Sequence, residues 1–558
     1  MNDFFQEILN KHTAPGQMFE TKEVINKSGI KFNEYINFPD SIRGYLDFAL
    51  LHAEKECLVY EDERYTYKEV FEKSAQTGNA LISQGIKKGD RVAICMQNNP
   101  EFIFAYLGIV GVGAVCVPLN SWWVPSEVIY GLEHSDAKIL FADQKRMQGL
   151  DSLIAVKKII TTYTPDPSYE SFSEFIKDQP ISFPETKISR DDHATIYYTS
   201  GSTGNPKGVL SSQKAVIATL FSWACFSSVM KEIDSQKDPN SSALLDTASA
   251  ILLCVPLFHV TGSHAGMFMS ILVGRKIVMM KKWDAGDALK LIEQEKITDI
   301  TGVPTQTWEL LNHPERLKYD LTSLKTLGAG GSPRPAEHVK QLDSEFEARP
   351  GIGYGLSETN ALGALGSGDE YVNHPQSTGR VVPPLTEIKI IDENWNELQE
   401  GEVGEIAIKS LGNMICYWKN PEATKDCMSD DGWFKSGDLG KFEGPFLYIM
   451  DRVKDIVIRG GENIACPEVE AAIYEHKDVL EAVVFGIPDE RLGEVLCSAI
   501  YLREDSNLTI EELQVFLSSR LAAFKIPINI KFLESNLPKV GSGKFDKPAL
   551  RKQYAQEF

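Results

Sequence analysis

Short apolar runs alternate with amphipathic stretches along the first half of the chain. Residues 65–85 carry apolar positions at helical spacing, residues 91–96 form a continuous apolar run of strand length, and residues 100–113 return to a helix-like pattern. A strand-like run at 114–120 and a helix-like stretch at 125–136 follow. Short strands separated by helices are typical of βαβ units, so the pattern predicts a largely parallel sheet covered by helices.

The pattern changes in the second half of the chain. Beyond Pro383 short alternating runs at 386–392 and 404–410 favour antiparallel strands, and from Asp451 a smaller series of strand-like and helix-like runs continues to the end. We therefore predict an α/β protein. Its large N-terminal domain has layered, largely parallel sheets with helices plus a β-rich subdomain, and a small α+β C-terminal domain follows.

Two further segments differ from this pattern. The opening residues, to about Asn37, mix charge with an apolar period and predict helices lying on the body of the protein. Residues 232–248 are polar and rich in turn-forming types, which predicts a surface excursion between strands.

Composition narrows the class of protein. At 558 residues, with 43% hydrophobic and 24% charged residues, the chain is long enough for two or more globular domains. A formal charge of −21 argues against a nucleic-acid surface, and any anionic substrate needs a local positive site.

Cysteine usage and hydropathy bear on the compartment. The nine cysteines show no metal-ligand spacing, which favours reduced, buried thiols. The N-terminal residues have no continuous apolar core typical of a signal peptide, and the run from Tyr106 to Leu119 is too short to span a bilayer. We expect a cytoplasmic protein without an integral membrane segment.

The stretch 197–209, YYTSGSTGNPKGV, carries the strongest chemical signal. Hydroxyl residues alternate with glycines, and Lys207 follows Pro206. Glycine lets backbone N–H groups turn toward an anion, hydroxyls add donors, and lysine supplies charge, so the stretch predicts a polyphosphate-binding loop. The Walker pattern is not met, because no glycine precedes Lys207 and no Ser or Thr follows it directly. A flexible Ser/Gly loop is the alternative.

Later glycine turns add candidate ligands. In the stretch 351–360, GIGYGLSETN, Tyr354 can stack on an adenine, Ser357 can donate to a phosphate, and Glu358 is an oxygen ligand suited to Mg²⁺. Asp438, in the turn 433–440, can accept both ribose hydroxyls, although an ordinary surface turn would look the same.

Three other stretches have a plain structural reading beside a functional one. His259 follows an apolar strand and is compatible with a histidine held by a backbone carbonyl. Arg452 and Asp455 could form an exposed ion pair, and residues 537–547 form a basic glycine loop before a C-terminal helix.

Together these motifs resemble the adenylate-forming enzymes: acyl-CoA synthetases, the adenylation domains of peptide synthetases and luciferase-type ligases. TSGSTGNPKG at 199–208 resembles their phosphate loop, and six motifs follow the family's order over roughly residues 50–550. The resemblance implies that a carboxylic acid reacts with ATP to give an acyl-adenylate and pyrophosphate, and that the acyl group then passes to a thiol.

The resemblance also implies roles for individual residues. The implied catalytic residues are Lys544, Glu358 (also the Mg²⁺ ligand), Thr199 and His259. The implied ATP and AMP contacts are Thr199, Ser200, Gly201, Ser202, Thr203, Gly204, Lys207, Gly330, Gly331, Ser332, Tyr354, Gly355, Ser357, Asp438 and Arg452. The implied hinge lies at 451–454 with Lys454, between an N-terminal domain at 1–450 and a mobile C-terminal domain at 455–558.

The sequence says less about the thiol that accepts the acyl group and about the acid that is activated. RGGENI at 459–464 resembles the glycine turn of CoA ligases, so we expect Gly460, Gly461 and Glu462 to contact CoA, with a separate acyl carrier protein as the alternative. The implied acyl pocket consists of His259, Gly262, Ala329, Gly330, Gly353 and Ala361. Small, uncharged walls favour a medium- or long-chain fatty acid, with an aryl acid as the alternative.

Two other functional classes stay open at this stage. A luciferase-like oxygenase shares the motifs, and an inactive nucleotide sensor could share the fold, although Lys207, Glu358, Asp438 and Lys544 are all present. A homodimer is a possible assembly.

Overall fold

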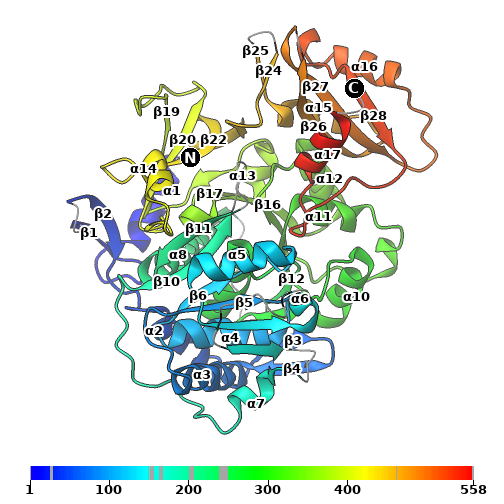
Figure 1. Cartoon of the computed structure of the whole chain (residues 1–558). Coiled ribbons are helices and arrows are strands. Elements are labelled where there is room, and N and C mark those ends of the chain that lie inside the picture. The colour runs from blue at the N-terminus through cyan, green and yellow to red at the C-terminus, as the bar shows by residue number, and fades with distance from the viewer. Residues whose placement is uncertain are drawn as a thin grey trace.

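The computed structural model describes residues 2–25, 29–148, 150, 156, 158–162, 168–199, 206–237, 249–459, 462–489 and 491–555. Two large sheets build the N-terminal domain, and a smaller sheet builds the C-terminal domain. In Figure 1 the C-terminal domain, coloured orange to red, stands beside the green helices α11 (Pro304–Leu311) and α12 (Ala336–Glu345). This contact places the last part of the chain against the large domain.

The first sheet contains the strands that lead into and out of the glycine-rich loop. Its order is β21 (Cys416–Tyr417), β11 (Lys207–Ser212), β10 (His193–Thr199), β6 (Val115–Pro118), β5 (Arg91–Cys95), β7 (Ile139–Asp143), β8 (Lys158–Thr162) and β9 (Glu170–Ser171). From β10 to β9 neighbouring strands are parallel, whereas β10–β11 and β11–β21 are antiparallel.

The second sheet is longer and joins the two kinds of strand expected from the sequence. Its order is β19 (Thr386–Ile391), β20 (Gly404–Ser410), β22 (Phe434–Glu443), β23 (Phe446–Arg452), β18 (Arg380–Val381), β17 (Ala364–Ser367), β16 (Arg349–Tyr354), β15 (Thr326–Gly330), β14 (Asp299–Gly302), β12 (Ala250–Leu253), β13 (Lys276–Met279), β3 (Glu56–Tyr60) and β4 (Glu63–Thr66). Strands β3 and β12–β16 are parallel, and β17–β20, β22 and β23 continue the sheet in antiparallel order. The β-rich part beyond Pro383 is therefore an extension of the parallel sheet.

Helices cover these sheets. Those of the large domain are α1 (Asn2–His12), α2 (Ile42–Leu50), α3 (Tyr67–Ser83), α4 (Pro100–Gly111), α5 (Pro125–Ser135), α6 (Gln144–Met147), α7 (Phe172–Ile176), α8 (Gln213–Lys237), η1 (Thr261–Phe268, a π-helix), α9 (Met269–Val273), α10 (Ala285–Glu295), α11, η2 (Arg316–Lys318), α12, η3 (Ser357–Thr359), α13 (Gly368–Asn373) and α14 (Pro421–Cys427).

The predicted βαβ pattern is confirmed, and local signals fix its helix boundaries. The helix expected at 65–85 is α3. The Thr66 hydroxyl accepts from the backbone N–H of Glu69, and the Glu69 carboxylate accepts from the backbone N–H of Thr66, which together form a capping box. The helix expected at 100–113 is α4, which Asn99 caps before Pro100.

The N-terminal segment differs from the sequence prediction of helices. Among its described residues, 2–25 and 29–37, only α1 is helical, and β1 (Thr21–Ile25) pairs with β2 (Lys31–Tyr35) as an antiparallel hairpin. Burial alternates along β2, where Phe32 is partly buried between the exposed Lys31 and Asn33. This alternation, together with Gly29 at φ +81°, is the hairpin signal that a helical interpretation overlooks.

The C-terminal domain has its own sheet and core. Strands β25 (Glu462–Ile464), β24 (Val457–Arg459), β27 (Gly493–Leu502) and β26 (Val479–Asp489) follow one another, and β28 (Asn529–Leu533) pairs with β27. The domain's helices are α15 (Cys466–Tyr474), α16 (Ile510–Ser518), η4 (Ala523–Lys525) and α17 (Lys547–Tyr554). With the large α/β domain, this α+β unit confirms the predicted fold class.

One helix of the described part is long and apolar enough to span a bilayer by length and composition. It lies within α8, at Gln213–Gln236, and 78% of its most apolar window is buried inside the protein. Val216, Leu220 and Phe221 of this helix are almost completely buried in the core of the large domain. Such burial is typical of the core helix of a globular domain.

Candidate active site

The glycine-rich stretch joins two antiparallel strands. Thr199 ends β10, Lys207 begins β11, and the two residues are directly opposite in the register. The predicted loop residues Ser200, Gly201, Ser202, Thr203 and Gly204 lie outside the described residues. Thr199 and Lys207 therefore mark the two ends of the segment that we expect to bind phosphate.

Lys207 and Glu358 come together on either side of a tyrosine. The Lys207 Nζ lies 4.1 Å from the centroid of the Tyr417 ring, and the Tyr417 hydroxyl donates to Glu358 Oε1 at 2.7 Å. Burial raises the pKa of the Glu358 carboxyl, while the Tyr417 hydroxyl and the Lys207 charge oppose that shift. Tyr417 was not among the residues identified from the sequence.

Tyr354, Asp438 and Arg452 form a second group. Tyr354 ends β16, and its hydroxyl donates to Asp438 Oδ2 at 2.9 Å. Asp438 and Arg452 are direct neighbours across β22 and β23, with the Arg452 Nε 3.3 Å from Asp438 Oδ1. Burial raises the pKa of Asp438 even though Arg452 favours its charged form. An arginine side chain that is 62% exposed and a buried carboxylate thus lie beside the predicted adenine position.

Lys544 reaches this group from the other domain. Gly330 ends β15 beside Gly353, and Gly331 follows at φ +77°. A Cβ at Gly331 would lie 2.9 Å from the Lys544 Nζ, so the lysine lies directly on the glycine backbone. Burial lowers the pKa of Lys544 to about 8, with Arg452 acting in the same direction and Asp438 opposing it.

The loop that carries Lys544 is fixed to the large domain at several points. Thr305 donates its hydroxyl to the Gly543 carbonyl at 2.8 Å, and Lys539 pairs with Glu309. Gly541 lies flat against the Trp122 indole, where a Cβ would come within 2.3 Å of the ring. In this arrangement of the domains, Lys544 lies within electrostatic range of Arg452, which also acts on Glu358.

One predicted acyl-pocket residue, His259, lies within electrostatic range of Lys544. Burial and the charge of Lys544 lower the pKa of His259 to about 3, so its imidazole is neutral at physiological pH. At Gly262, however, a Cβ would lie 2.3 Å from the Pro256 carbonyl oxygen. At Gly353 the equivalent position is 3.1 Å from Leu365. At both glycines the missing Cβ therefore accommodates a neighbouring group, and the assignment of these residues to an acyl pocket stays a prediction.

A buried chain of polar side chains lies behind this region. The Tyr106 and Tyr197 hydroxyls are 3.0 Å apart, Tyr197 is 2.6 Å from the Ser263 Oγ, and Ser263 is 3.0 Å from His264 Nδ1. The chain ends at Asn360, whose Oδ1 is 3.2 Å from His264 Nε2. None of these five residues is identified from the sequence, because most of their partners are distant in the chain.

Asn360 determines the direction of these hydrogen bonds. Its Nδ2 donates to the Gly412 carbonyl at 2.8 Å and to the Ser211 Oγ at 3.1 Å, so its Oδ1 is the acceptor that faces His264. His264 therefore carries its proton on Nε2 and accepts from Ser263 on Nδ1. Burial lowers the pKa of His264 to about 4, consistent with this neutral form.

Comparison with known proteins assigns the family. The model of the AMP-binding enzyme family matches residues 47–418, and that of the AMP-binding enzyme C-terminal domain matches residues 468–544. The chain belongs to the AMP-binding enzyme family.

Relatives in the family act on different acids. A feruloyl-CoA synthase from Amycolatopsis sp is 32% identical over 494 residues, 88% of this chain and 94% of the relative. A long-chain-fatty-acid–CoA ligase from Bacillus subtilis is 31% identical over 552 residues, 92% and 93% of the two chains. The structure of o-succinylbenzoate CoA synthetase from Bacillus subtilis with its acyl-adenylate intermediate superposes with a TM-score of 0.75 at 28% identity, covering 91% of this chain and 97% of that one.

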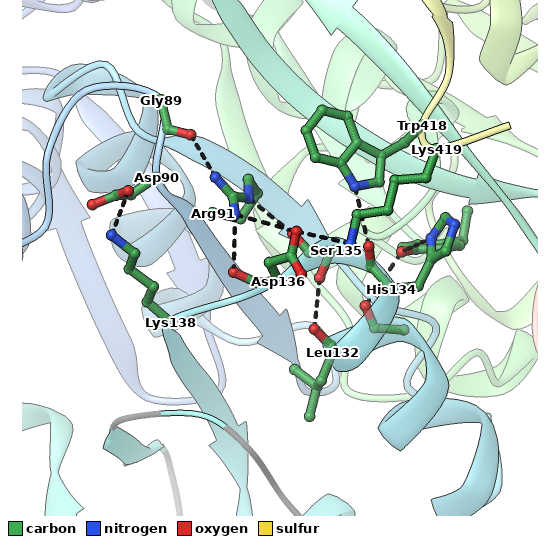
Figure 2. Close-up of polar contacts among 12 residues, drawn as sticks. Gly89, Asp90, Arg91, Leu132, His134, Ser135, Asp136, Lys138, Trp418 and Lys419 are labelled. Atoms are coloured by element: carbon green, nitrogen blue, oxygen red, sulfur yellow. Dashed lines mark hydrogen bonds and ion pairs between the residues drawn. The ribbon is translucent and has the colours of Figure 1, made fainter. Parts of the chain in front are cut away.

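The segment that carries Tyr417 is tied to the first sheet by its neighbours (Figure 2). The Trp418 indole N–H donates to the His134 carbonyl at 3.1 Å, and the Arg91 guanidinium lies 5.7 Å from the Trp418 ring. Lys419 pairs with Asp136 at 2.8 Å, but both side chains are about half exposed. Such exposed pairs contribute little to stability, so Trp418 is the main anchor.

The residues present fit a magnesium ion with few protein ligands. Among the described residues no group of three His, Cys, Asp or Glu side chains could hold a metal. Glu358 offers one buried carboxylate beside Lys207, and Mg²⁺ in nucleotide sites commonly takes one or two carboxylates, with phosphate oxygens and water as the other ligands.

The remaining predicted residues belong to both domains and to the segment between them. Lys454 is exposed between the end of β23 and the start of β24, and Glu462 is exposed at the start of β25. Gly460 and Gly461 lie outside the described residues. Ser332 and Ser357 are partly exposed beside Gly331 and Glu358, whereas a Cβ at Gly355 would lie 2.3 Å from the Ala361 backbone.

The buried chain yields a stability prediction at Asn360, which has a left-handed conformation at φ +52°. Asn360→Gly accepts this conformation but leaves His264, Ser211 and the Gly412 carbonyl without their partner. We expect the free energy of unfolding to fall by about 2–4 kcal/mol, measured by denaturant titration.

Asn360→Ala serves as the comparison, because it loses the same hydrogen bonds and adds backbone strain. It should be less stable than Asn360→Gly by about 1–2 kcal/mol. A glycine variant as stable as the wild-type protein would show that the chain of hydrogen bonds adds no stability.

Proposed function

We propose that the protein activates a medium- or long-chain fatty acid as its acyl-adenylate and then transfers the acyl group to CoA. The class, an AMP-forming acid–CoA ligase, follows from the family and from relatives named as CoA ligases and synthetases. The observation that carries the proposal is the position of Lys544, which extends from the small domain to Gly331 and lies within the electrostatic reach of Asp438 and Arg452.

The main difficulty of the first step is the repulsion between a carboxylate and a triphosphate. Lys207 at the entrance of the glycine-rich loop and Lys544 at Gly331 provide positive charge on opposite sides of the nucleotide. Thr199 adds a hydroxyl at the strand end. A Mg²⁺ ion held by Glu358 would supply Lewis-acid charge at the phosphates. The acid's own oxygen attacks the α-phosphorus and pyrophosphate leaves, so no nucleophilic side chain is needed.

The nucleoside would be held by the second group of residues. Tyr354 offers its ring to the adenine beside Gly330, Gly331 and Ser332. Asp438 offers a carboxylate oxygen to the ribose, with Arg452 beside it. Because Tyr354 already donates to one oxygen of Asp438, the carboxylate is held in a fixed orientation before the nucleotide binds.

The second step would need another arrangement of the domains. In the arrangement described, Lys544 occupies the site while Glu462, at the start of β25 in the same domain, is exposed. We propose that the C-terminal domain, 455–558, rotates about the segment 451–454 with Lys454 as the hinge. The rotation would bring the turn at 460–462 to the site for CoA. A separate acyl carrier protein is the alternative acceptor.

The acid is the least constrained part of the proposal. A neutral His259 and the absence of a charged group among the proposed wall residues support an uncharged acyl chain. The close packing at Gly262 and Gly353 reduces the space expected for it. An aryl acid therefore remains the second candidate, supported by the relative named feruloyl-CoA synthase.

A panel of acids tests the substrate class. Acid-dependent pyrophosphate release with acetate, octanoate, palmitate, benzoate and 4-coumarate should give the highest kcat/KM with octanoate or palmitate. A preference for benzoate or 4-coumarate by more than about tenfold would replace the fatty acid by the aryl acid. No release with any acid in the panel, or with a wider one, would contradict adenylation itself.

Replacing Lys544 tests the two steps separately. Lys544→Ala removes a charge at the reacting centre, so pyrophosphate exchange should fall by about 10²–10³-fold or more. Transfer from a supplied acyl-adenylate to CoA should stay within a few-fold of the wild-type rate. Lys552→Ala, an exposed lysine on α17, is the matched control and should leave both rates unchanged. Exchange near the wild-type rate in Lys544→Ala would exclude the lysine from adenylation.

The lowered pKa of Lys544 predicts a pH effect. Its ammonium is present below about pH 8 and is lost above it, so kcat/KM for adenylation should fall as the pH rises through about 8. The fall should approach tenfold per pH unit. The residual activity of Lys544→Ala should lack this alkaline decrease, and a decrease retained in the variant would assign it to another group.

A further inference from the structure

Tyr417 contacts two oppositely charged side chains of the site with two parts of one ring. Its aromatic face lies under the Lys207 ammonium at 4.1 Å, and its hydroxyl donates to Glu358 Oε1 at 2.7 Å. Cation–π contacts of this length and charge-assisted hydrogen bonds are both directional. The tyrosine therefore restrains the position of both charges.

The strand register explains why the ring meets Lys207. Tyr417 is directly opposite Val209 in the antiparallel pair β11–β21. Lys207 precedes Val209 by two residues, so both side chains point to the same face of the sheet as Tyr417. Diagonal neighbours on one face are within reach of long and aromatic side chains. The backbone pairing therefore brings the Lys207 and Tyr417 side chains within reach of each other.

The ring has little freedom to move. Tyr417 is 5% exposed and packs with Val209, Met414 and Phe434. Its own backbone N–H donates to the Thr424 hydroxyl at 3.0 Å. The next residue, Trp418, donates its backbone N–H to the Gly208 carbonyl at 2.7 Å and its indole N–H to the His134 carbonyl (Figure 2).

We propose that Tyr417 is a positioning residue of the adenylation site. Its hydroxyl holds the Glu358 carboxylate in the orientation that receives the metal, and its ring holds the Lys207 ammonium at the entrance of the glycine-rich loop. The inference rests on the proposed function, because it assigns Glu358 and Lys207 to Mg²⁺ and phosphate. Partners of metal-binding carboxylates commonly alter metal affinity by about 10–100-fold when they are removed.

A purely structural tyrosine would behave differently. If Tyr417 only filled space between β11 and β22, removing its hydroxyl would change stability and leave the dependence on Mg²⁺ and ATP as it was. The hydroxyl and the ring act on different charges, so two substitutions separate them. Tyr417→Phe keeps the ring on Lys207 and removes the donor to Glu358, whereas Tyr417→Leu removes both.

The experiment uses the full-length protein and three readouts. The first is the Mg²⁺ concentration that gives half-maximal pyrophosphate exchange at saturating ATP. The second is the affinity for ATP without metal, measured by calorimetry in excess EDTA. The third is the Tm. Tyr45→Phe is the matched control, because it removes a buried hydroxyl that donates to the Phe268 carbonyl in the large domain core.

We expect the two Tyr417 variants to differ in their metal-free affinity for ATP. For Tyr417→Phe the Mg²⁺ concentration at half-maximal exchange should rise by at least about tenfold. Its metal-free affinity for ATP should stay within about twofold of wild type. Tyr417→Leu should show the same Mg²⁺ shift and also bind metal-free ATP about threefold or more weakly. Tyr45→Phe should change only the Tm. If Tyr417→Leu does not fold, Tyr417→Met replaces it.

Other results would overturn the proposal. An unchanged Mg²⁺ requirement in Tyr417→Phe would show that the hydroxyl does not position Glu358. Equal metal-free ATP affinities of the Phe and Leu variants would show that the ring does not position Lys207. A wild-type enzyme that exchanges no pyrophosphate with any acid contradicts the proposed function instead. Metal-free ATP binding can still be compared in that case.

Discussion

Placing the Lys544 ammonium in a partly desolvated site of another domain is the constraint on which the arrangement of this protein depends. An ammonium removed from water loses hydration free energy that must be offset by nearby opposite charge or by the contacts that hold it. Asp438 provides the charge, and Arg452 works against it. The contacts are distributed along the loop, from the pairing of Lys539 with Glu309 to the bond between Thr305 and Gly543. Lys544 therefore lies beside Gly331 because the two domains are docked through these contacts.

The chemical motifs could be read from the sequence because their function depends on residue type and local spacing. Lys207, Glu358 and Lys544 lie in short glycine- or turn-rich stretches that indicate charge near a flexible backbone. Their contacts to Tyr417 and Gly331 depend on strands and domains that meet from distant parts of the chain. No local signal marks Tyr417, since its position follows from the pairing of β21 with β11.

The N-terminal hairpin and the surroundings of Gly262 could not be predicted from local sequence. Residues 21–25, TKEVI, show no period of two, so their pairing with residues 31–35 has little local signal. At Gly262 the missing Cβ accommodates the Pro256 carbonyl oxygen, a neighbour that the sequence does not reveal. A glycine indicates a close approach as readily as an opening.

The shortness of the connection between the domains has a consequence for how strongly they need to bind each other. Residues 453–456 alone separate the end of β23 from the start of β24. Because the tether is this short, docking of the loop is an intramolecular event, and the effective concentration of Lys544 at the site is set by the tether and not by the amount of protein. Weak contacts are then sufficient to populate the docked state. Along the loop itself, the bond from Thr305 to Gly543 and the packing of Gly541 on Trp122 can therefore hold the lysine in place without a large apolar interface.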